Sequence, residues 1–278
     1  MIDLHSHTVH SDGDRSPDQL LAEAAAAGIQ VLSVTDHDTV SGIADCQVAA
    51  ARHGVRLIPG IELSCELHGR EVHVLGHFLD PLSPALGKLA QGMLAERRER
   101  MERMVLRAQE EGLAGVTMER VVAASGGDNL GRPHLARVLV DSGHAASIKD
   151  AFEKFLRNKG RLWVDRRRLS VPDALEILHG AGATASVAHP GANGISRQEL
   201  RVMADAGLDA VEAHHPEHPP NQAEAFERWA AELHMLVTAG SDYHGPSVQP
   251  ERKLGDRWLA PDRFAALEER ARELVQVS

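Results

Sequence analysis

The feature that most constrains this chain is the regular alternation of short apolar runs with amphipathic stretches. Seven runs resemble β-strands and end in polar residues: Met1–His5, Val31–Thr35, Val55–Glu62, Glu71–Phe78, Thr184–His189, Asp209–His214 and Met235–Asp242. Most are separated by helical patterns at Pro17–Ala27, Val40–His53, Val171–Gly180, Arg197–Ala206 and Asn221–Leu233. This alternation predicts an α/β fold with parallel strands and right-handed crossovers.

The first predicted helix carries signals at both of its ends. Ser16 is a good N-cap, Pro17 suits the first helical position, and Gln19 would complete a capping box. Gly28 then suits the position just after the helix, where a left-handed backbone is common.

The alternation breaks between residues 81 and 165. Leu86–Glu111 predicts one long charged helix, and shorter helices are expected around Met118–Ala124, Pro133–Asp141 and Ser147–Arg157. We therefore expect residues 81–165 to form an inserted helical subdomain, with residues 1–80 and 166–278 forming the main domain.

Side chains of the types that bind metals recur at the ends of the strand-like runs. They are His5, His7, Asp36, His37, Asp38, Glu62, His73, His189, His214, His215, Asp242 and His244. In parallel α/β folds the carboxyl ends of the strands share one face, so groups distant in sequence would meet in one pocket. The two-residue period of a strand also points His5 and His7 to the same side.

The types of these side chains indicate which cations would bind. Imidazole and carboxylate ligands suit borderline cations such as Mn²⁺, Fe²⁺ or Zn²⁺, and Cys46 and Cys65 have no metal-like spacing. Three or four ligands fill one site, so this number implies at least two metals. Glu62 is a natural candidate for a carboxylate shared between them.

The motifs H-x-H, D-H-D, P-G-I-E, A-H-P-G and S-D-x-H, in this order, resemble those of the PHP (polymerase and histidinol phosphatase) family. The resemblance covers Met1–Phe78 and roughly Ser170–Gly245. It implies a distorted seven-stranded (β/α) barrel related to the amidohydrolases, with up to three bound divalent metals. Of these metals Mn²⁺ is preferred, with Fe²⁺ and Zn²⁺ as alternatives.

The resemblance also implies three sets of ligands. One metal would bind His5, His7, Glu62 and Asp242, a second Glu62, His73 and His189, and a third Asp12, His37 and His244. Many relatives have a histidine where we place Asp12, and His10 is the other candidate for that position. Asp12 is preferred because the sequence S-D-G matches the more similar subgroup.

Clustered divalent metals generate a hydroxide at neutral pH and stabilise the oxygens of a displacement at phosphorus. We therefore expect a metal-bound hydroxide to attack a phosphate ester, which is the main reaction of the PHP family. The leaving oxygen must be neutralised by a metal or by an acid. His189, His214 and Asp242 are the candidates for proton transfer.

Groups outside the metal ligands should select the substrate. The motif G-R-P-H places Arg132 and His134 at a helix start, where phosphate binds readily. Lys159 and His214 are further candidates for binding phosphate. A cationic phosphate-binding site separate from the metals suggests a substrate with two phosphate groups. The motif resembles a PHP subgroup of nucleoside 3′,5′-bisphosphate phosphatases, such as those that convert adenosine 3′,5′-bisphosphate to AMP, and 5′–3′ exonucleases of short RNA.

Composition limits the partners. The formal charge of −10 argues against binding long nucleic acid, and three Trp, one Tyr and five Phe are too few for an extended stacking groove. Trp163 or Phe155 is expected to stack on one base at most. The N-terminus has no signal-peptide pattern and no apolar run is long enough to span a membrane, so we expect a cytoplasmic protein that binds a small nucleotide. No protein partner is evident.

Several other functions remain open at this point. The second candidate is an exonuclease that acts on short 5′-phosphorylated oligoribonucleotides. A third is a non-catalytic, metal-stabilised binding module, which the intact ligand set disfavours. Hydrolysis of C–N bonds or of histidinol phosphate would leave Arg132 and the basic insertion without a purpose.

Overall fold

The computed structural model describes residues 1–127, 129–165 and 168–277, and its centre is a nearly closed barrel of seven strands. The strands follow one another around the barrel in chain order: β1 Ile2–Asp3, β2 Val31–Val34, β3 Arg56–Leu67, β4 Arg70–His77, β6 Thr184–Val187, β7 Ala210–His214 and β8 Leu236–Ala239. The ends of the sheet approach each other where the Leu4 amide donates to the Ala239 carbonyl at 3.1 Å. The predicted seven-stranded α/β barrel is confirmed.

The direction of β4 differs from the prediction of parallel strands, because β4 runs antiparallel to both β3 and β6. The reason is the connection between β3 and β4, which consists of His68 and Gly69 alone. Both residues have positive φ, 51° and 76°, as a two-residue hairpin turn of type I′ requires. A turn this short can only join antiparallel strands. The structure also adds a short strand, β5 (Leu169–Ser170), which pairs with β3.

Helices cover the outside of the barrel: α1 Pro17–Ala26, α2 Ile43–His53, α7 Val171–Gly180, α8 Arg197–Asp205, α9 Pro220–Glu232 and α10 Pro261–Val277. The end signals of α1 are confirmed, since Ser16 and Gln19 form a capping box and Gly28 has a φ of 78°. Helix α10 was not among the predicted helices. None of the helices in the described residues is long and apolar enough to cross a membrane.

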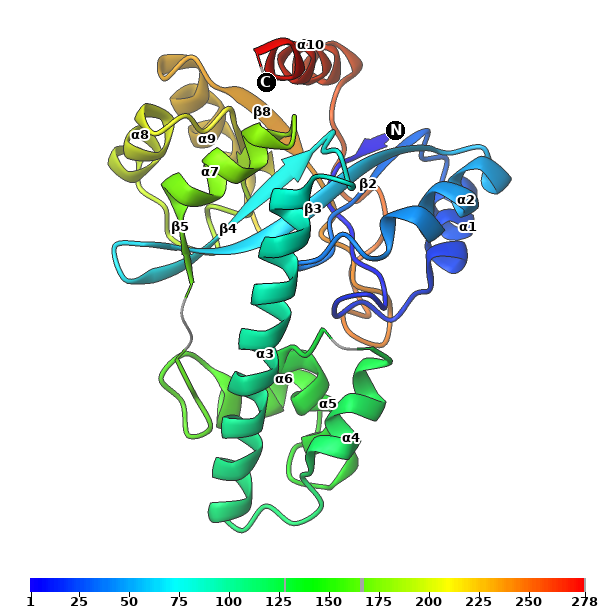
Figure 1. Ribbon diagram of the computed structural model, residues 1–278, viewed down its shortest axis with the longest axis vertical. Coiled ribbons are helices and arrows are strands. Elements are labelled where there is room, and N and C mark those ends of the chain that lie inside the picture. The colour runs from blue at the N-terminus through cyan, green and yellow to red at the C-terminus, as the bar shows by residue number, and fades with distance from the viewer. Residues whose placement is uncertain (128, 166–167, 278) are drawn as a thin grey trace.

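The interruption after β4 is helical, as predicted: α3 Pro84–Glu110, α4 Met118–Ser125, α5 Arg132–Asp141, α6 Ile148–Ala151 and the π-helix η1 Phe152–Leu156. Figure 1 shows α3 leading away from the barrel into the group formed by α4, α5 and α6. Leu86 near the start of α3 packs in the core of the barrel, whereas Met101 and Met104 belong to a separate hydrophobic cluster with Leu135 and Leu139. The predicted return to the main domain falls at residues 166 and 167, which lie outside the described part of the chain.

The barrel is tied to its outer helices by one buried carboxylate at the start of β7. Asp209 accepts hydrogen bonds from the Ala185 amide of β6 and from His179 of α7, each at 2.8 Å, and from Arg270 of α10 at 2.7 Å. Although burial alone would raise its pKa, the bonds from His179 and Ala185 lower the pKa of Asp209. The ionised carboxylate therefore stabilises the folded state.

Replacing this carboxylate should destabilise the protein because three donors on three elements lose their acceptor. We expect Asp209→Ala to lower the free energy of unfolding by about 2–3 kcal/mol in denaturant titrations. The contribution of ionised Asp209 to the free energy of unfolding should be complete above the unfolded-state pKa of about 3.9. It should be lost as the pH falls through the lower pKa of Asp209 in the folded state. Arg272→Ala, which breaks an exposed pair with Glu269, is the control and should change stability by less than about 0.5 kcal/mol. Equal effects of the two substitutions would contradict this role of Asp209.

Candidate metal centre

The H-x-H motif lies just beyond β1 with both imidazoles fully buried. The Nε2 atoms of His5 and His7 are 3.2 Å apart, and each is 3.2 Å from Oε2 of Glu62. Oδ1 of Asp242, which follows β8, is 3.3 Å from the same two nitrogens. Four side chains from three strands therefore direct one ligand atom each at a common point, as predicted for the first set.

The other oxygen of Glu62 faces a second group of imidazoles. Oε1 lies 2.8 Å from Nδ1 of His73 and 3.0 Å from Nε2 of His189. His37 is also close, with Nδ1 3.2 Å from Oε2. The two oxygens of Glu62 thus point at different clusters, which is the arrangement expected of a carboxylate shared by two cations.

A third group forms around Asp12. Its Oδ1 lies 3.3 Å from Nε2 of His244, and its Oδ2 lies 3.7 Å from Nε2 of His37. The ring of His7 stacks on that of His244 with centroids 4.0 Å apart. His10 points away, since its Nδ1 is 3.2 Å from Ser41 Oγ. Of the two residues considered for this position, the structure brings Asp12 to the cluster and leaves His10 outside.

These groups fit divalent cations. The ligand atoms lie within 4.8 Å of one another in each of three sets of side chains: His5, His7, Glu62 and Asp242; His7, Asp12, His37 and His244; and His37, Glu62 and His73. The last set contains His37 where His189 was predicted. Among the described residues, Asp12 Oδ1 and His37 Nδ1 are buried and make no hydrogen bond of suitable geometry, although His244 and Glu62 lie 3.3 and 3.2 Å away. Buried polar atoms normally have hydrogen-bond partners. Imidazole nitrogen and carboxylate oxygen without thiolate suit Mn²⁺, Fe²⁺ or Zn²⁺.

The electrostatics of the cluster favour bound cations. Burial alone would raise the pKa values of Glu62 and Asp242, but the surrounding imidazoles hold both well below their usual range. Burial would lower the pKa of His7, yet Asp242 and Glu62 raise it to about 10. His73 behaves like His7, because Glu62 raises its pKa to about 9 against the effect of burial, whereas burial lowers the pKa of His37 to about 3. Without another cation, the negative charge therefore retains protons on His7 and His73. Metal binding would displace them.

Comparisons with known proteins identify the family to which this chain belongs. The PHP domain model matches residues 3–161. The 5′–3′ exoribonuclease Rnm of Salmonella typhimurium is 32% identical over 268 residues, which are 93% of this chain and 90% of that protein. The chain belongs to the PHP family.

Other known proteins have a similar sequence identity to this chain. The 3′,5′-nucleoside bisphosphate phosphatase of Chromobacterium violaceum is 32% identical over 249 residues, 88% of this chain and 87% of that protein. A solved structure of an amidohydrolase from the same organism, with bound sulfate and no metal, has a TM-score of 0.88 and 30% identity over 97% of this chain and 96% of that chain. A candidate metal-dependent phosphoesterase from Bifidobacterium adolescentis has a TM-score of 0.89 and 31% identity over 96% and 95% of the two chains.

Residues that the sequence analysis did not single out support the PHP ligands. Glu212, on β7, is fully buried and lies 3.0 Å from Nδ1 of His5, while its other oxygen accepts from the His189 amide at 2.6 Å. It fixes which nitrogen of His5 faces the cluster, a common role for a carboxylate behind a metal-binding imidazole. The sequence signal that could have identified Glu212 is its position on β7, two residues before His214.

Backbone strain is concentrated at the same place. Asp38, His189 and Asp242 have positive φ values of 55°, 30° and 51°, which are uncommon for residues other than glycine. Gly240 lies so close to β1 that an added Cβ would come 2.3 Å from Cβ of His5. Such strain persists where the surrounding structure fixes the backbone, and it often marks functional sites.

The inserted helices reach the PHP site through Arg97 of α3. Its Nε donates to Oδ2 of Asp38 at 2.7 Å, and the Arg97 side chain is only 10% exposed. Asp38 also accepts from the Ser64 amide at 2.7 Å, so this ion pair spans the segments that carry His37 and Glu62. Arg97 was not predicted, because nothing in the charged sequence of α3 distinguishes it from its exposed neighbours.

Arg132 and His134 lie at the start of α5, as predicted. Arg132 donates to Asn158 at 2.8 Å and approaches Glu71 Oε2 at 3.7 Å, and Glu71 lies 3.9 Å from Nε2 of His73. His134 is buried and accepts the Gly131 amide at Nδ1, so its other nitrogen carries the hydrogen.

The environment of His134 also fixes its charge. Burial lowers the pKa of His134 to about 4, which keeps the ring neutral at neutral pH. It can therefore act only as a neutral hydrogen-bond donor at that nitrogen. Lys159 is exposed in the loop that follows η1, next to Asn158.

The two aromatic candidates for base stacking occupy other positions. Phe155 is 5% exposed and belongs to the core of the inserted helices. Trp163 packs against the guanidinium groups of Arg100, Arg132 and Arg168, with their central carbons 4.8, 5.4 and 5.8 Å from its ring centroids. Trp163 thus supports arginines beside the site.

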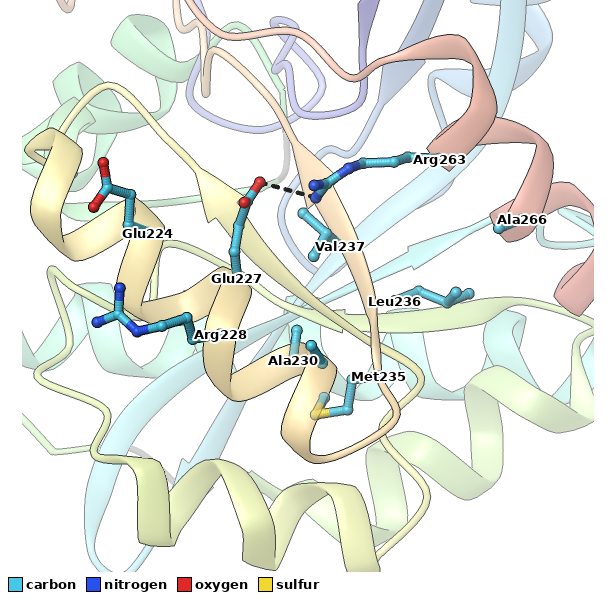
Figure 2. A pocket seen from close by; sticks show the side chains of 10 residues that line it. Glu224, Glu227, Arg228, Ala230, Met235, Leu236, Val237, Arg263 and Ala266 are labelled. Atoms are coloured by element: carbon cyan, nitrogen blue, oxygen red, sulfur yellow. Dashed lines mark ion pairs between the residues drawn. The ribbon is translucent and has the colours of Figure 1, made fainter.

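His214, a predicted phosphate-binding and proton-transfer residue, lies away from the pocket that holds the other strand-end groups. Its Nε2 lies 2.7 Å from Glu227 of α9, which also pairs with Arg263 on the outer side of the barrel (Figure 2). The cause is a bulge in β7 between Glu212 and His214, which breaks the two-residue alternation. The next residue, His215, is buried instead, with Nε2 3.3 Å from Asp242 Oδ2.

Removing the charge of Glu62 should disrupt metal binding because two clusters share this carboxylate. We expect Glu62→Gln to weaken Mn²⁺ binding at least about a hundredfold, as measured by calorimetry and by metal content after dialysis. Glu66→Gln, an exposed change on the same strand, should retain the affinity of the unsubstituted protein. Normal metal content in Glu62→Gln would remove Glu62 from the ligand set.

Proposed function

We propose that this protein hydrolyses the 3′-phosphate of nucleoside 3′,5′-bisphosphates, for example converting adenosine 3′,5′-bisphosphate to AMP. The chain is a metal-dependent phosphoesterase of the PHP family. The proposed substrate is supported by a second position at which phosphate could bind, beside the metal centre. Arg132, at the N-terminus of α5, is linked to His73 through Glu71 by contacts of 3.7 and 3.9 Å.

Two anchors for phosphate fit a substrate with two phosphate groups. In this proposal Arg132, with Lys159 and the neutral His134, binds the 5′-phosphate, because guanidinium groups and helix N-termini both favour phosphate oxygens. The 3′-phosphate lies over the metal ligands.

We propose two or three divalent ions, with Mn²⁺ preferred over Fe²⁺ and Zn²⁺. Bound at the nine ligands listed above, they would supply an activated water and neutralise charge on the phosphate oxygens. The protein itself must deliver a proton to the leaving 3′-oxygen. Asp242 is the candidate next to the reacting phosphate, and His189 is the other. His215, which contacts Asp242 in place of His214, is proposed to orient that carboxylate.

The second candidate is a 5′–3′ exonuclease acting on short 5′-phosphorylated oligoribonucleotides. The relative with that activity in its name is 32% identical to this chain, the same identity as the named bisphosphate phosphatase. A 5′-phosphorylated strand also presents its first two phosphates in the same order. The net charge of −10 disfavours the binding of long nucleic-acid strands, whichever of the two activities the protein has.

The two activities can be separated with defined substrates. Manganese-loaded protein is incubated with adenosine 3′,5′-bisphosphate and, separately, with a 5′-phosphorylated trinucleotide, followed by chromatography and a phosphate assay. We expect AMP and inorganic phosphate from the bisphosphate. Faster release of mononucleotides from the trinucleotide would make the exonuclease the main activity. Failure to cleave either substrate with metal bound would contradict both candidates.

Arg132 provides a test of the second phosphate anchor. Because a charge-assisted contact with phosphate is lost, Arg132→Ala should raise KM for the bisphosphate by about 10- to 100-fold. KM for 4-nitrophenyl phosphate, which has one phosphate, should change by less than about threefold. Arg98→Ala, an exposed change on α3 that breaks a pair with Glu102, is the control. Equal losses with both substrates would remove the proposed role of Arg132.

A further inference from the structure

Two ligands of the proposed third metal lie in loops and not on strands. Asp12 is in the loop between β1 and α1, and His244 is in the loop that follows β8. Figure 1 shows these two loops, coloured blue and orange, side by side. Because neither ligand is in a strand, contacts made by neighbouring residues must fix the positions of the two side chains.

The two loops are joined directly beside these ligands. The Asp14 amide donates to the His244 carbonyl at 2.8 Å, and the Asp14 carboxylate accepts from the Ser247 amide at 2.6 Å. The loops approach so closely at Gly245 that an added Cβ would lie 1.6 Å from Oδ1 of Asp14. Displacement of one loop would therefore displace the other.

One carboxylate on α1 binds a side chain from each loop. Oε1 of Glu23 accepts from Arg15 Nε at 2.6 Å, and Oε2 accepts from the Tyr243 hydroxyl at 2.8 Å. Arg15 is three residues after Asp12, and Tyr243 directly precedes His244. Each oxygen of Glu23 thus ties one ligand-bearing loop to the same helix.

Helix α1 gives these contacts a rigid support. Leu20, Leu21 and Ala24 of this helix are fully buried, and they belong to the same hydrophobic cluster as Tyr243, which is 6% exposed. Close packing in such a cluster limits the movement of side chains. The Tyr243 hydroxyl is therefore held next to Glu23.

We propose that Glu23 is a positioning residue for the third metal: through Arg15 and Tyr243 it keeps Asp12 and His244 directed at one cation. The inference rests on the proposed function, which includes this third ion. It extends the metal centre to a helix on the outside of the barrel. Residues that hold metal ligands in place from behind typically change the metal affinity about 10- to 100-fold when they are replaced.

The other metals should not depend on Glu23, because their ligands are held by other contacts. The Asp242 carboxylate accepts from Arg252 at 2.7 Å, and the Asp242 amide donates to the His5 carbonyl at 2.8 Å. Glu62 lies within β3, where it is paired with β4. Loss of the Glu23 carboxylate should therefore weaken the binding of one ion only.

The number and affinity of bound ions test this inference without a substrate. Glu23→Leu removes both hydrogen bonds of the carboxylate, whereas Tyr243→Phe removes only one of them. Bound Mn²⁺ is counted by equilibrium dialysis, its affinities are measured by calorimetry, and circular dichroism confirms folding. Asp18→Leu is the matched control, because Asp18 is an exposed carboxylate on the same helix that pairs with Arg52 at 2.6 Å.

We expect Glu23→Leu to lower the affinity for one Mn²⁺ about tenfold or more and to leave the other affinities unchanged within about twofold. Tyr243→Phe should give a smaller loss at the same ion, and Asp18→Leu should give none. In protein that already carries Asp12→Asn, which removes a ligand of the third metal, Glu23→Leu should cause no further change. Two substitutions that act on one site are not additive.

Other outcomes would overturn the inference. These are a similar loss of affinity at every ion in Glu23→Leu, unchanged affinities in that variant, or binding of only two ions by the unsubstituted protein. The proposed function is tested separately, by hydrolysis of the bisphosphate. Protein that binds three ions in the expected manner and does not hydrolyse the bisphosphate would contradict the proposed function alone, so the two failures are distinguishable.

Discussion

The structure depends on one buried carboxylate, Glu62, whose two oxygens face different groups of imidazoles. One oxygen lies within 3.2 Å of nitrogens from His5, His7 and His37, and the other within 3.0 Å of His73 and His189. Gathering so many polar groups in a fully buried site is costly unless their charges are balanced. A cluster of this kind needs several strands to end at one place, and the barrel provides that place.

The inserted helices are connected to the same carboxylate through the backbone. Arg97 binds Asp38, whose amide donates to the Glu62 carbonyl at 2.9 Å, and Asn129 donates to the His37 carbonyl at 2.5 Å. The inserted helices, which are proposed to bind the substrate, are therefore held in place against the segments that contain the metal ligands. Such rigid support matters because small displacements of a substrate from its reactive position slow catalysis strongly.

The sequence predicted much of this arrangement from local patterns. The seven strands, the capping box around Ser16 and Gln19 and the helical interruption were all predicted, because each depends on residues close together in the chain. Nine predicted metal ligands, from His5 to His244, come together in the structure. Most of them could be located because they follow strand-like runs, and parallel strands of a barrel end on one face. Asp12 was assigned only through the resemblance to the PHP family, and His73 lies on the antiparallel strand β4.

By itself, then, the sequence determined which residue types end each strand, and so the kind of chemistry that the site can support. The tertiary structure alone decided which of two adjacent histidines faces that site. A bulge in β7 turns His214 outward to Glu227 and places His215 beside Asp242. The bulge depends on how β7 registers with β8, and the partners of Arg97 and Glu212 likewise lie far away in the chain. Local periodicity carries no information about such contacts, because packing between distant segments sets them.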